Sequence, residues 1–320
     1  MSGAGDLLDR RLLVVTGKGG VGKTTVAAAL ATAAAAGGRR TLVCELDGTG
    51  DLAAAFGSGP VGYRGAELAP GVRVMEMDTE ASLREYLRVQ ARLPVVGRLA
   101  PLARIFDFVA TAAPGVREVL TIGKPAWEAH ERHYDLVVVD ATATGHVIGQ
   151  LDAPAAIADL VRTGRLRQQL DWMIELLTDP RRTAAVVVAT PEETPVLETV
   201  ELLASLRGRV GVAVGALVAT RVLPVPFTRA QEAVHAALAD HLGKVAALTV
   251  DGVAVGPGVE GCWRVAGHLA ARRRTQRSHL VELADAAGGA GVPLLFVGYE
   301  PDPDRVLDAT VEALTAEAGW

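Results

Sequence analysis

A stretch of nine residues near the start of the chain combines glycine, lysine and threonine in a spacing that suits a phosphate group. It contains the pattern Gly-x4-Gly-Lys-Thr of a phosphate-binding loop, or P-loop. Glycines let the backbone approach phosphate oxygens, and successive N–H groups at a helix N-terminus then bind the anion. We expect Lys23 to contact the β- and γ-phosphates of a nucleotide, and the Thr24 hydroxyl to bind Mg²⁺. The predicted nucleotide contacts of this loop are Gly17, Lys18, Gly19, Gly20, Val21, Gly22, Lys23, Thr24 and Thr25.

Acidic residues follow two apolar runs that read as strands. The later run ends in Asp140, which we expect to hold Mg²⁺ directly or through water. The earlier run leads to Asp47, and an acid at the carboxyl end of a parallel strand lies where α/β sheets bind ligands. Asp47 is therefore the candidate for orienting the attacking water, with Glu45 and Asp51 as rivals. A turn aspartate with no catalytic role is the competing interpretation of Asp47.

The residues after Asp140 form a second small polar segment, Thr144-Gly145-His146. A loop at this place would sense the γ-phosphate, with Gly145 supplying flexibility and a backbone N–H. His146 is either a residue that faces the ligand or a structural histidine, and the sequence favours neither.

Short apolar runs rich in valine and leucine recur along the chain, and their length suits strands buried on both faces of a parallel sheet. They are Leu12–Thr16, Thr41–Glu45, Val72–Met77, Leu136–Asp140, Ala184–Ala189, Val212–Ala219 and Leu294–Val297. Segments with helical spacing lie between them, among them Glu193–Leu206, Arg229–Leu242, Val265–Ala287 and Pro303–Ala316. The alternation predicts an α/β fold with a doubly wound, mostly parallel sheet, in a single P-loop domain over residues 1–320.

One region, residues 81–133, breaks this alternation because no convincing strand occurs in it. It reads as a helical insertion whose helices are interrupted at Pro94, Pro101, Pro114 and Pro125. It carries many apolar residues, including Leu99, Leu102, Ile105, Phe106 and Phe108. Helices packed on the sheet are the simpler interpretation, and a lid or groove for a hydrophobic client is the alternative.

Composition limits the classes of partner. The net charge is −5, so the chain is a poor default binder of nucleic acid or of anionic membranes. The acidic stretch Asp302–Trp320 lacks the basic face of a membrane-targeting helix, so we expect no direct membrane anchor. Two cysteines, Cys44 and Cys262, offer no disulfide framework, and no secretory signal is visible. A soluble, cytoplasmic protein is the expectation.

Taken together, the motifs resemble those of the ArsA-like ATPases. That family contains the arsenite-pump ATPase and the tail-anchored-protein targeting ATPase, and it lies beside the ParA/MinD partitioning ATPases. The resemblance covers nearly the whole chain and rests on segments that occur in the order of the family. These are Gly17–Thr25, Asp47 with Phe56, Asp140 with Thr144-Gly145-His146, Glu192 with Glu198-Thr199, Arg221–Pro224 and Pro293–Phe296.

The resemblance implies an ATPase that uses ATP and Mg²⁺ and works as a homodimer or as a heterodimer with a paralogue. Lys18, the additional lysine of this P-loop form, would reach across the dimer to the nucleotide of the other subunit, as an arginine finger does. Asp47 would act on the catalytic water, and Glu192 would contact the nucleotide near the dimer interface. Thr220 and Arg221 would lie by the adenine, and the helical region would rearrange around a hydrophobic protein client.

Three positions depart from the family pattern. Gly48 and Ala143 stand where proline is usual, and Thr220 stands where an asparagine would offer more hydrogen-bonding groups to the base. No cysteine triad for arsenite is present in the sequence. Two alternatives therefore stay open: a ParA/MinD-like positioning ATPase, and a weakly hydrolysing nucleotide-binding subunit that acts as structural partner of an active paralogue.

Overall fold

A computed structural model describes residues 4–89 and 115–320 of the chain. Its centre is an eight-stranded sheet in the order β10-β7-β6-β1-β5-β2-β4-β3, in which all neighbours are parallel except β3 and β4. The strands are β1 (Leu12–Gly17), β2 (Thr41–Glu45), β3 (Ala66–Ala69), β4 (Val72–Glu76), β5 (Leu136–Ala143), β6 (Thr183–Ala189), β7 (Val214–Val222) and β10 (Leu294–Gly298). The predicted mostly parallel α/β fold is confirmed, and each predicted strand is present.

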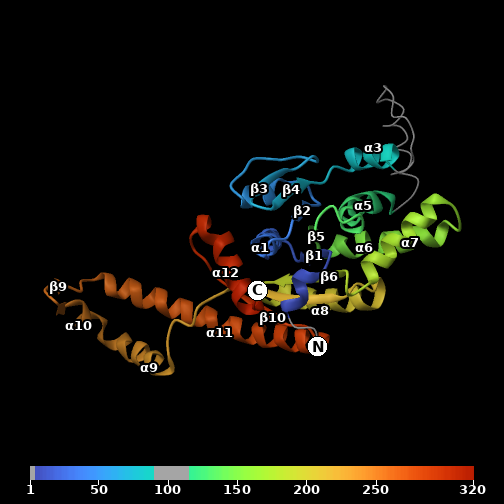
Figure 1. Ribbon diagram of the computed structural model, residues 1–320. Helices are drawn as coiled ribbons and strands as arrows, with labels where there is room; N and C mark the ends of the chain where they lie inside the picture. The colour runs from blue at the N-terminus through green and yellow to red at the C-terminus, as the bar shows by residue number, and fades with distance from the viewer. Residues whose placement is uncertain (1–3, 90–114) are drawn as a thin grey trace.

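Helices cover both faces of this sheet because successive strand residues point to opposite sides (Figure 1). Val14 and Val139 face one apolar core, whereas Val15 and Val138 face the other. The first core is closed by α5 (Val116–His130), α6 (Thr144–Leu160), α7 (Arg165–Thr178), α8 (Glu193–Ser205) and the end of α11 (Gly258–Ala290). The second is closed by α1 (Lys23–Ala36), α2 (Asp51–Ala55) and α12 (Val306–Ala318). Short helical turns are η1 (Ala4–Asp9), η2 (Leu206–Val210) and η4 (Pro303–Arg305).

The described part of the segment 81–133 forms most of α3 (Thr79–Val89), the whole of α5 and the turn after α5. Leu99, Leu102, Ile105, Phe106, Phe108, Pro94, Pro101 and Pro114 lie outside the described residues. The prediction that Pro125 interrupts a helix is wrong, because Pro125 is inside α5. It is buried next to Ala126 and Ala129, which pack in the core against the sheet. This packing offsets the loss of one backbone hydrogen bond, which would break an exposed helix.

A helical hairpin extends away from the sheet (Figure 1). It runs through α9 (Arg229–Leu238), η3 (Ala239–His241), α10 (Leu242–Ala246), β8 (Thr249–Val250), β9 (Val253–Ala254) and the first half of α11. His235 and Trp263 hold α9 to α11: the two rings stack with centroids 5.1 Å apart, and Trp263 Nε1 donates to the carbonyl of His235 over 2.9 Å. The sequence predicted helical segments at Arg229–Leu242 and Val265–Ala287. In the structure the first is divided between α9, η3 and the start of α10, and the second is part of the longer helix α11.

Among the described residues, none of the helices combines the length and apolar character required to cross a bilayer.

Candidate nucleotide site

The P-loop curls around the start of α1, and its shape depends on glycine. Gly17 has φ of 149°, and a Cβ there would come within 2.1 Å of the Val188 carbonyl oxygen on β6. Gly20 and Gly22 have φ of 81° and 94°, which L side chains rarely adopt. The ammonium of Lys23 donates to the carbonyl of Lys18 over 3.3 Å and so spans the loop with one of its three donors. The loop thus presents backbone N–H groups and a cation at the helix N-terminus.

Asp140 lies directly behind this loop. Its strand β5 lies between β1 and β2, so that Asp140 pairs in register with Val15 on one side and with Glu45 on the other. Only 6% of Asp140 is exposed, and burial raises its pKa to about 7. Thr24 and Lys23 act to lower this pKa, while the charges of Glu45 and Asp47 raise it. The site therefore concentrates negative charge where the chain alone does not neutralise it.

The donor set around Asp140 suits Mg²⁺. The Asp140 Oδ1 atom is buried without a hydrogen-bond partner, and the Thr24 hydroxyl faces the same carboxylate. Mg²⁺ in nucleotide sites takes one or two protein oxygens and completes its shell with phosphates and water. Thr24 and Asp140 fit that role, and a cation there would offset the burial of the carboxylate.

The three acids near the end of β2 differ in their surroundings. Glu45 is buried, and its oxygens accept hydrogen bonds from the Thr49 hydroxyl (2.7 Å) and from the backbone N–H groups of Gly50 (3.0 Å) and Asp51 (3.1 Å). Glu45 therefore holds the turn that begins α2. Asp51 begins that helix and accepts a bond from Thr49. Asp47 is exposed, and its negative charge helps to raise the pKa of Asp140.

The backbone conformation at position 48 accounts for one departure from the family pattern, the glycine that stands where proline is usual. Its φ of 62° lies outside the range of proline, and a Cβ there would come 3.2 Å from the carbonyl oxygen of Met77. The loop after Asp47 therefore takes a path that a proline at this position would not allow.

A cavity of about 270 Å³ opens beside the P-loop. It is lined by Lys18, Gly19, Gly20, Val21, Thr190, Glu192, Glu193, Thr194, Pro195 and Arg221. The fold thus brings Glu192, at the N-terminus of α8, and Arg221, at the end of β7, to the same space as the loop. This is the place where a nucleotide bound to the P-loop would extend.

Thr220 lies behind this cavity. It is buried, and its hydroxyl donates to the carbonyl of Val21 over 2.6 Å. In this arrangement Thr220 supports the P-loop, and its hydroxyl proton is already used. Arg221, next to it, has φ of 53° and is held by Gln276 of α11, which donates to its carbonyl (3.1 Å) and accepts from the N–H of Leu223 (2.9 Å). Sequence reasoning missed Gln276, because a glutamine within a long helix carries no distinguishing signal.

Lys18 is held within its own chain. Its ammonium lies 2.7 Å from Oε1 of Glu198 on α8, and the hydroxyl of Thr144 donates to Oε2 of the same carboxylate over 3.0 Å. Lys18 lowers the pKa of Glu198. Thr144 is the first residue of α6, and the two residues after it, Gly145 and His146, are exposed. Glu198 was part of the resemblance, but sequence reasoning assigned it no contact.

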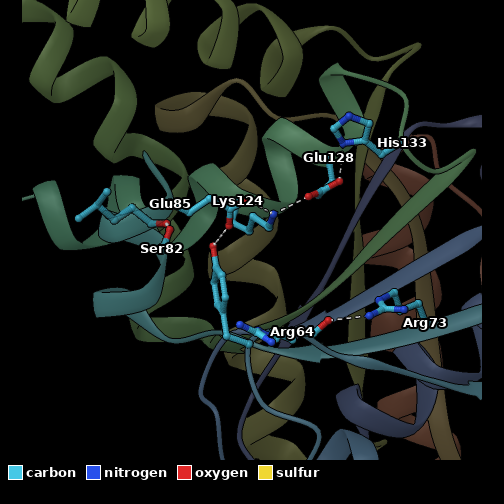
Figure 2. A network of polar contacts seen from close by, with 9 residues as sticks. Arg64, Arg73, Ser82, Glu85, Lys124, Glu128 and His133 are labelled. Carbon is cyan, nitrogen blue, oxygen red and sulfur yellow. Dashed lines mark hydrogen bonds and ion pairs between the residues drawn. The ribbon is translucent and has the colours of Figure 1, made fainter. Parts of the chain in front are cut away.

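A second cavity, of about 320 Å³, lies between α3, α5, α6 and α7. Most of its lining is apolar, including Leu83, Trp127, Ile157, Trp172 and Met173. Two of its lining residues, Glu85 and Lys124, belong to a polar network (Figure 2), in which Lys124 lies 2.8 Å from Glu85 and 2.6 Å from Glu128. Further contacts of the network are Tyr63 with Glu85 (2.5 Å) and His133 with Glu128 (2.7 Å).

The fold and the loop define a P-loop nucleotide-binding protein with a mostly parallel sheet. The sequence model of the anion-transporting ATPase (ArsA) family matches residues 10–176, which is more than half of the 320 residues. The chain belongs to this family.

Three relatives illustrate the similarity. The chain is 35% identical to ATPase BagA of Mycobacterium tuberculosis over 225 residues, which cover 67% of this chain and 66% of BagA, just under two thirds. It is 30% identical to a putative arsenical pump-driving ATPase of Halobacterium salinarum over 68% of this chain and 36% of that protein. It is 31% identical to ATPase get3 of Schizosaccharomyces japonicus over 45% of this chain and 44% of that protein.

Proposed function

We propose that this chain is a Mg²⁺-dependent ATPase that works as a dimer and couples its nucleotide state to a helical region that binds a client or partner. The observation that carries the proposal is the grouping of Lys23, Thr24, Asp47 and Asp140 at the N-terminus of α1. Beside them lies the cavity that Lys18, Glu192 and Arg221 line. The family and its ATPase-named members support the same class of reaction.

Hydrolysis would use these residues in separate roles. The P-loop N–H groups and Lys23 bind the β- and γ-phosphates, while Thr24 and Asp140 are the residues that would hold Mg²⁺. The cation would supply neutralisation of the phosphate charge. Asp47 orients the attacking water and accepts its proton, and Lys18 of the other subunit stabilises the charge that develops on the transferred group.

Coupling to the helical region would run through α6. This helix begins at Thr144, directly after the strand that carries Asp140, and its residue Ile157 lines the apolar cavity together with α3, α5 and α7. A change at the start of α6 that depends on the γ-phosphate would therefore reach the cavity wall through one continuous helix. We assign the client or partner surface to this side of the molecule, because its lining is apolar and aromatic.

Replacing the P-loop lysine tests the nucleotide site. Lys23→Ala should weaken ATP binding by at least about 100-fold, because it removes the cation that contacts two phosphates. Isothermal titration calorimetry with Mg²⁺ and ATP measures this loss, and Lys244→Ala, an exposed lysine on α10, serves as the matched control. ATP affinity that Lys23→Ala leaves near the wild-type value would mean that the nucleotide binds elsewhere.

Steady-state turnover by the purified chain tests the reaction. Phosphate release that requires Mg²⁺ and disappears in Lys23→Ala supports the proposal. Tight ATP binding without turnover would favour the alternative of a structural partner that hydrolyses only beside a paralogue.

A further inference from the structure

A single carboxylate contacts two segments that the proposed function expects to respond to the nucleotide. Glu198 binds the ammonium of Lys18, in the P-loop, through Oε1 at 2.7 Å. Through Oε2 it accepts a hydrogen bond from Thr144, which begins α6. The three residues come from three places in the sequence, and the fold alone brings them together. Glu198 is therefore the direct link between the lysine of the loop and the helix that follows β5.

The backbone at Glu198 is held in place because α8 packs against the core. Its neighbours Val196 and Thr199 are 1% and 2% exposed and anchor α8 against the core and the sheet. The carboxylate of Glu198 itself is at the surface, and the side chains of Lys18 and Glu198 are 33% and 32% exposed. A fixed backbone and a partly exposed head suit a contact that can form and break without unfolding the helix.

The contact conflicts with a role of Lys18 in another subunit. An ammonium that makes a charge-assisted hydrogen bond to Glu198 in its own chain is directed toward α8. To reach a phosphate bound to a second chain, its long side chain must leave this carboxylate. The ion pair and the contact in trans therefore exclude each other, so that the free energy of the pair opposes closure of the dimer.

We propose that Glu198 is a positioning residue that retains Lys18 in its own chain until a nucleotide-bound partner competes for it. This inference rests on the proposed dimeric ATPase. When Lys18 leaves, the Glu198 carboxylate keeps its hydrogen bond from Thr144 but loses its positively charged partner. The net charge beside the first turn of α6 therefore changes. Release of Lys18 and rearrangement at Thr144 are thereby coupled through one side chain.

The first experiment tests the contact in the single chain. Limited labelling with an amine-reactive reagent, read by peptide mass spectrometry without nucleotide, reports the availability of Lys18. Glu198→Gln should raise the labelling rate of Lys18 by about two- to fivefold, because a neutral amide holds the ammonium less tightly. Glu201→Gln, the same change at an exposed position of the same helix, should leave it unchanged. Equal labelling in all three proteins would overturn the inference.

The second experiment tests the consequence for assembly. Sedimentation velocity with Mg²⁺ and a non-hydrolysable ATP analogue measures the dimer dissociation constant. Both subunits release one pair on closure, so Glu198→Gln should lower this constant by about three- to tenfold. The affinity for the analogue under conditions that keep the chain monomeric should not change. In a Lys18→Ala background, Glu198→Gln should have no effect, which a merely structural role of Glu198 would not predict.

The outcomes separate the inference from the function on which it rests. A wild-type chain that dimerises with the analogue, and whose Glu198→Gln variant dimerises equally well, refutes the role of Glu198 and leaves the dimeric ATPase intact. A wild-type chain that binds the analogue but remains monomeric at all concentrations refutes both. A shift that persists in the Lys18→Ala background shows that Glu198 acts through Thr144 or α8, and also overturns the inference.

Discussion

The surroundings of Asp140 shift its pKa in opposite directions. Burial, Glu45 and Asp47 favour its neutral form, whereas Thr24 and Lys23 favour the charged form, and burial dominates so that its pKa rises to about 7. A bound cation would stabilise the charged form of this buried carboxylate. The same residue that suits Mg²⁺ therefore lowers the stability of the protein when no cation is bound.

Replacement of Asp140 should reveal this loss of stability in the pH dependence of the free energy of unfolding. Between the ordinary aspartate pKa and about 7, the folded chain holds a proton that the unfolded chain has lost, so the free energy of unfolding falls as pH rises through this window. Asp140→Asn cannot titrate. Its free energy of unfolding relative to wild type should therefore increase from pH 5 to pH 8 by about 2–3 kcal/mol. Urea unfolding without Mg²⁺ or nucleotide at the two pH values measures it.

The pH-dependent difference has a clear control. Asp304→Asn, at an exposed aspartate of η4, should give the same difference from wild type at both pH values. A constant difference for Asp140→Asn as well would show that Asp140 is ionised in the folded chain across this range.

We expect a different role for Asp47, because it is exposed and its neighbour Glu45 already holds the turn. Asp47→Asn should keep ATP affinity within about threefold and lower kcat by about 100-fold or more, since orientation and deprotonation of the water are lost. Asp51→Asn, its rival at the start of α2, should retain most turnover. ATP binding and turnover that fall in proportion in Asp47→Asn would point to a Mg²⁺ or structural role instead.

At the scale of the elements, β5 and α6 are one continuous link between the site and the apolar cavity. The strand carries Asp140, Thr144 begins the helix, and Ile157 in its later turns lines the cavity. On the opposite face, α1 and α12 pack on each other and on the sheet, and neither lines this cavity. A nucleotide-dependent change is therefore expected on the side of α5 and α7.

Hydrogen exchange should locate this change. In Asp47→Asn with ATP, amides of α5 and α7 should differ in exchange from those of the nucleotide-free protein, whereas amides of α12 should not. Binding of a hydrophobic dye under the same two conditions reports the exposed apolar surface. If neither readout on α5 and α7 responds to ATP, these helices are a static cover and the client surface must be sought elsewhere.

At the scale of the whole molecule, the proposed activity depends on a second chain. Lys18 is bound to Glu198 within its own chain, and in the proposed dimer it would leave Glu198 to reach the nucleotide of the partner. Turnover per subunit should therefore rise with protein concentration through the range in which dimers form. Parallel measurements of turnover and sedimentation check this, with Lys18→Ala expected to remove the rise. Constant turnover per subunit through a demonstrated monomer range would contradict the role in trans.

The sequence by itself determined the features that depend on neighbours along the chain. Buried strands are marked by runs of valine and leucine, and the P-loop by glycines whose φ values other residues rarely adopt, so the sheet, the loop and Asp140 were predicted from local pattern. The weaker local predictions were those that packing can override: Pro125 remains within α5 because buried neighbours stabilise that helix.

Only the tertiary structure decided which side chains meet. Lys18 and Glu198 are separated by 180 positions in sequence, and the Thr220 hydroxyl meets Val21 across 199. Such contacts follow from the order of β1, β6 and β7 in the sheet, which no local periodicity encodes. Glu45 and Asp47 both offer a carboxylate, and the sequence does not distinguish them. In the structure Glu45 is buried and anchors a turn, whereas Asp47 is open to solvent. Roles of this kind depend on distance and burial in three dimensions, and composition and spacing do not contain them.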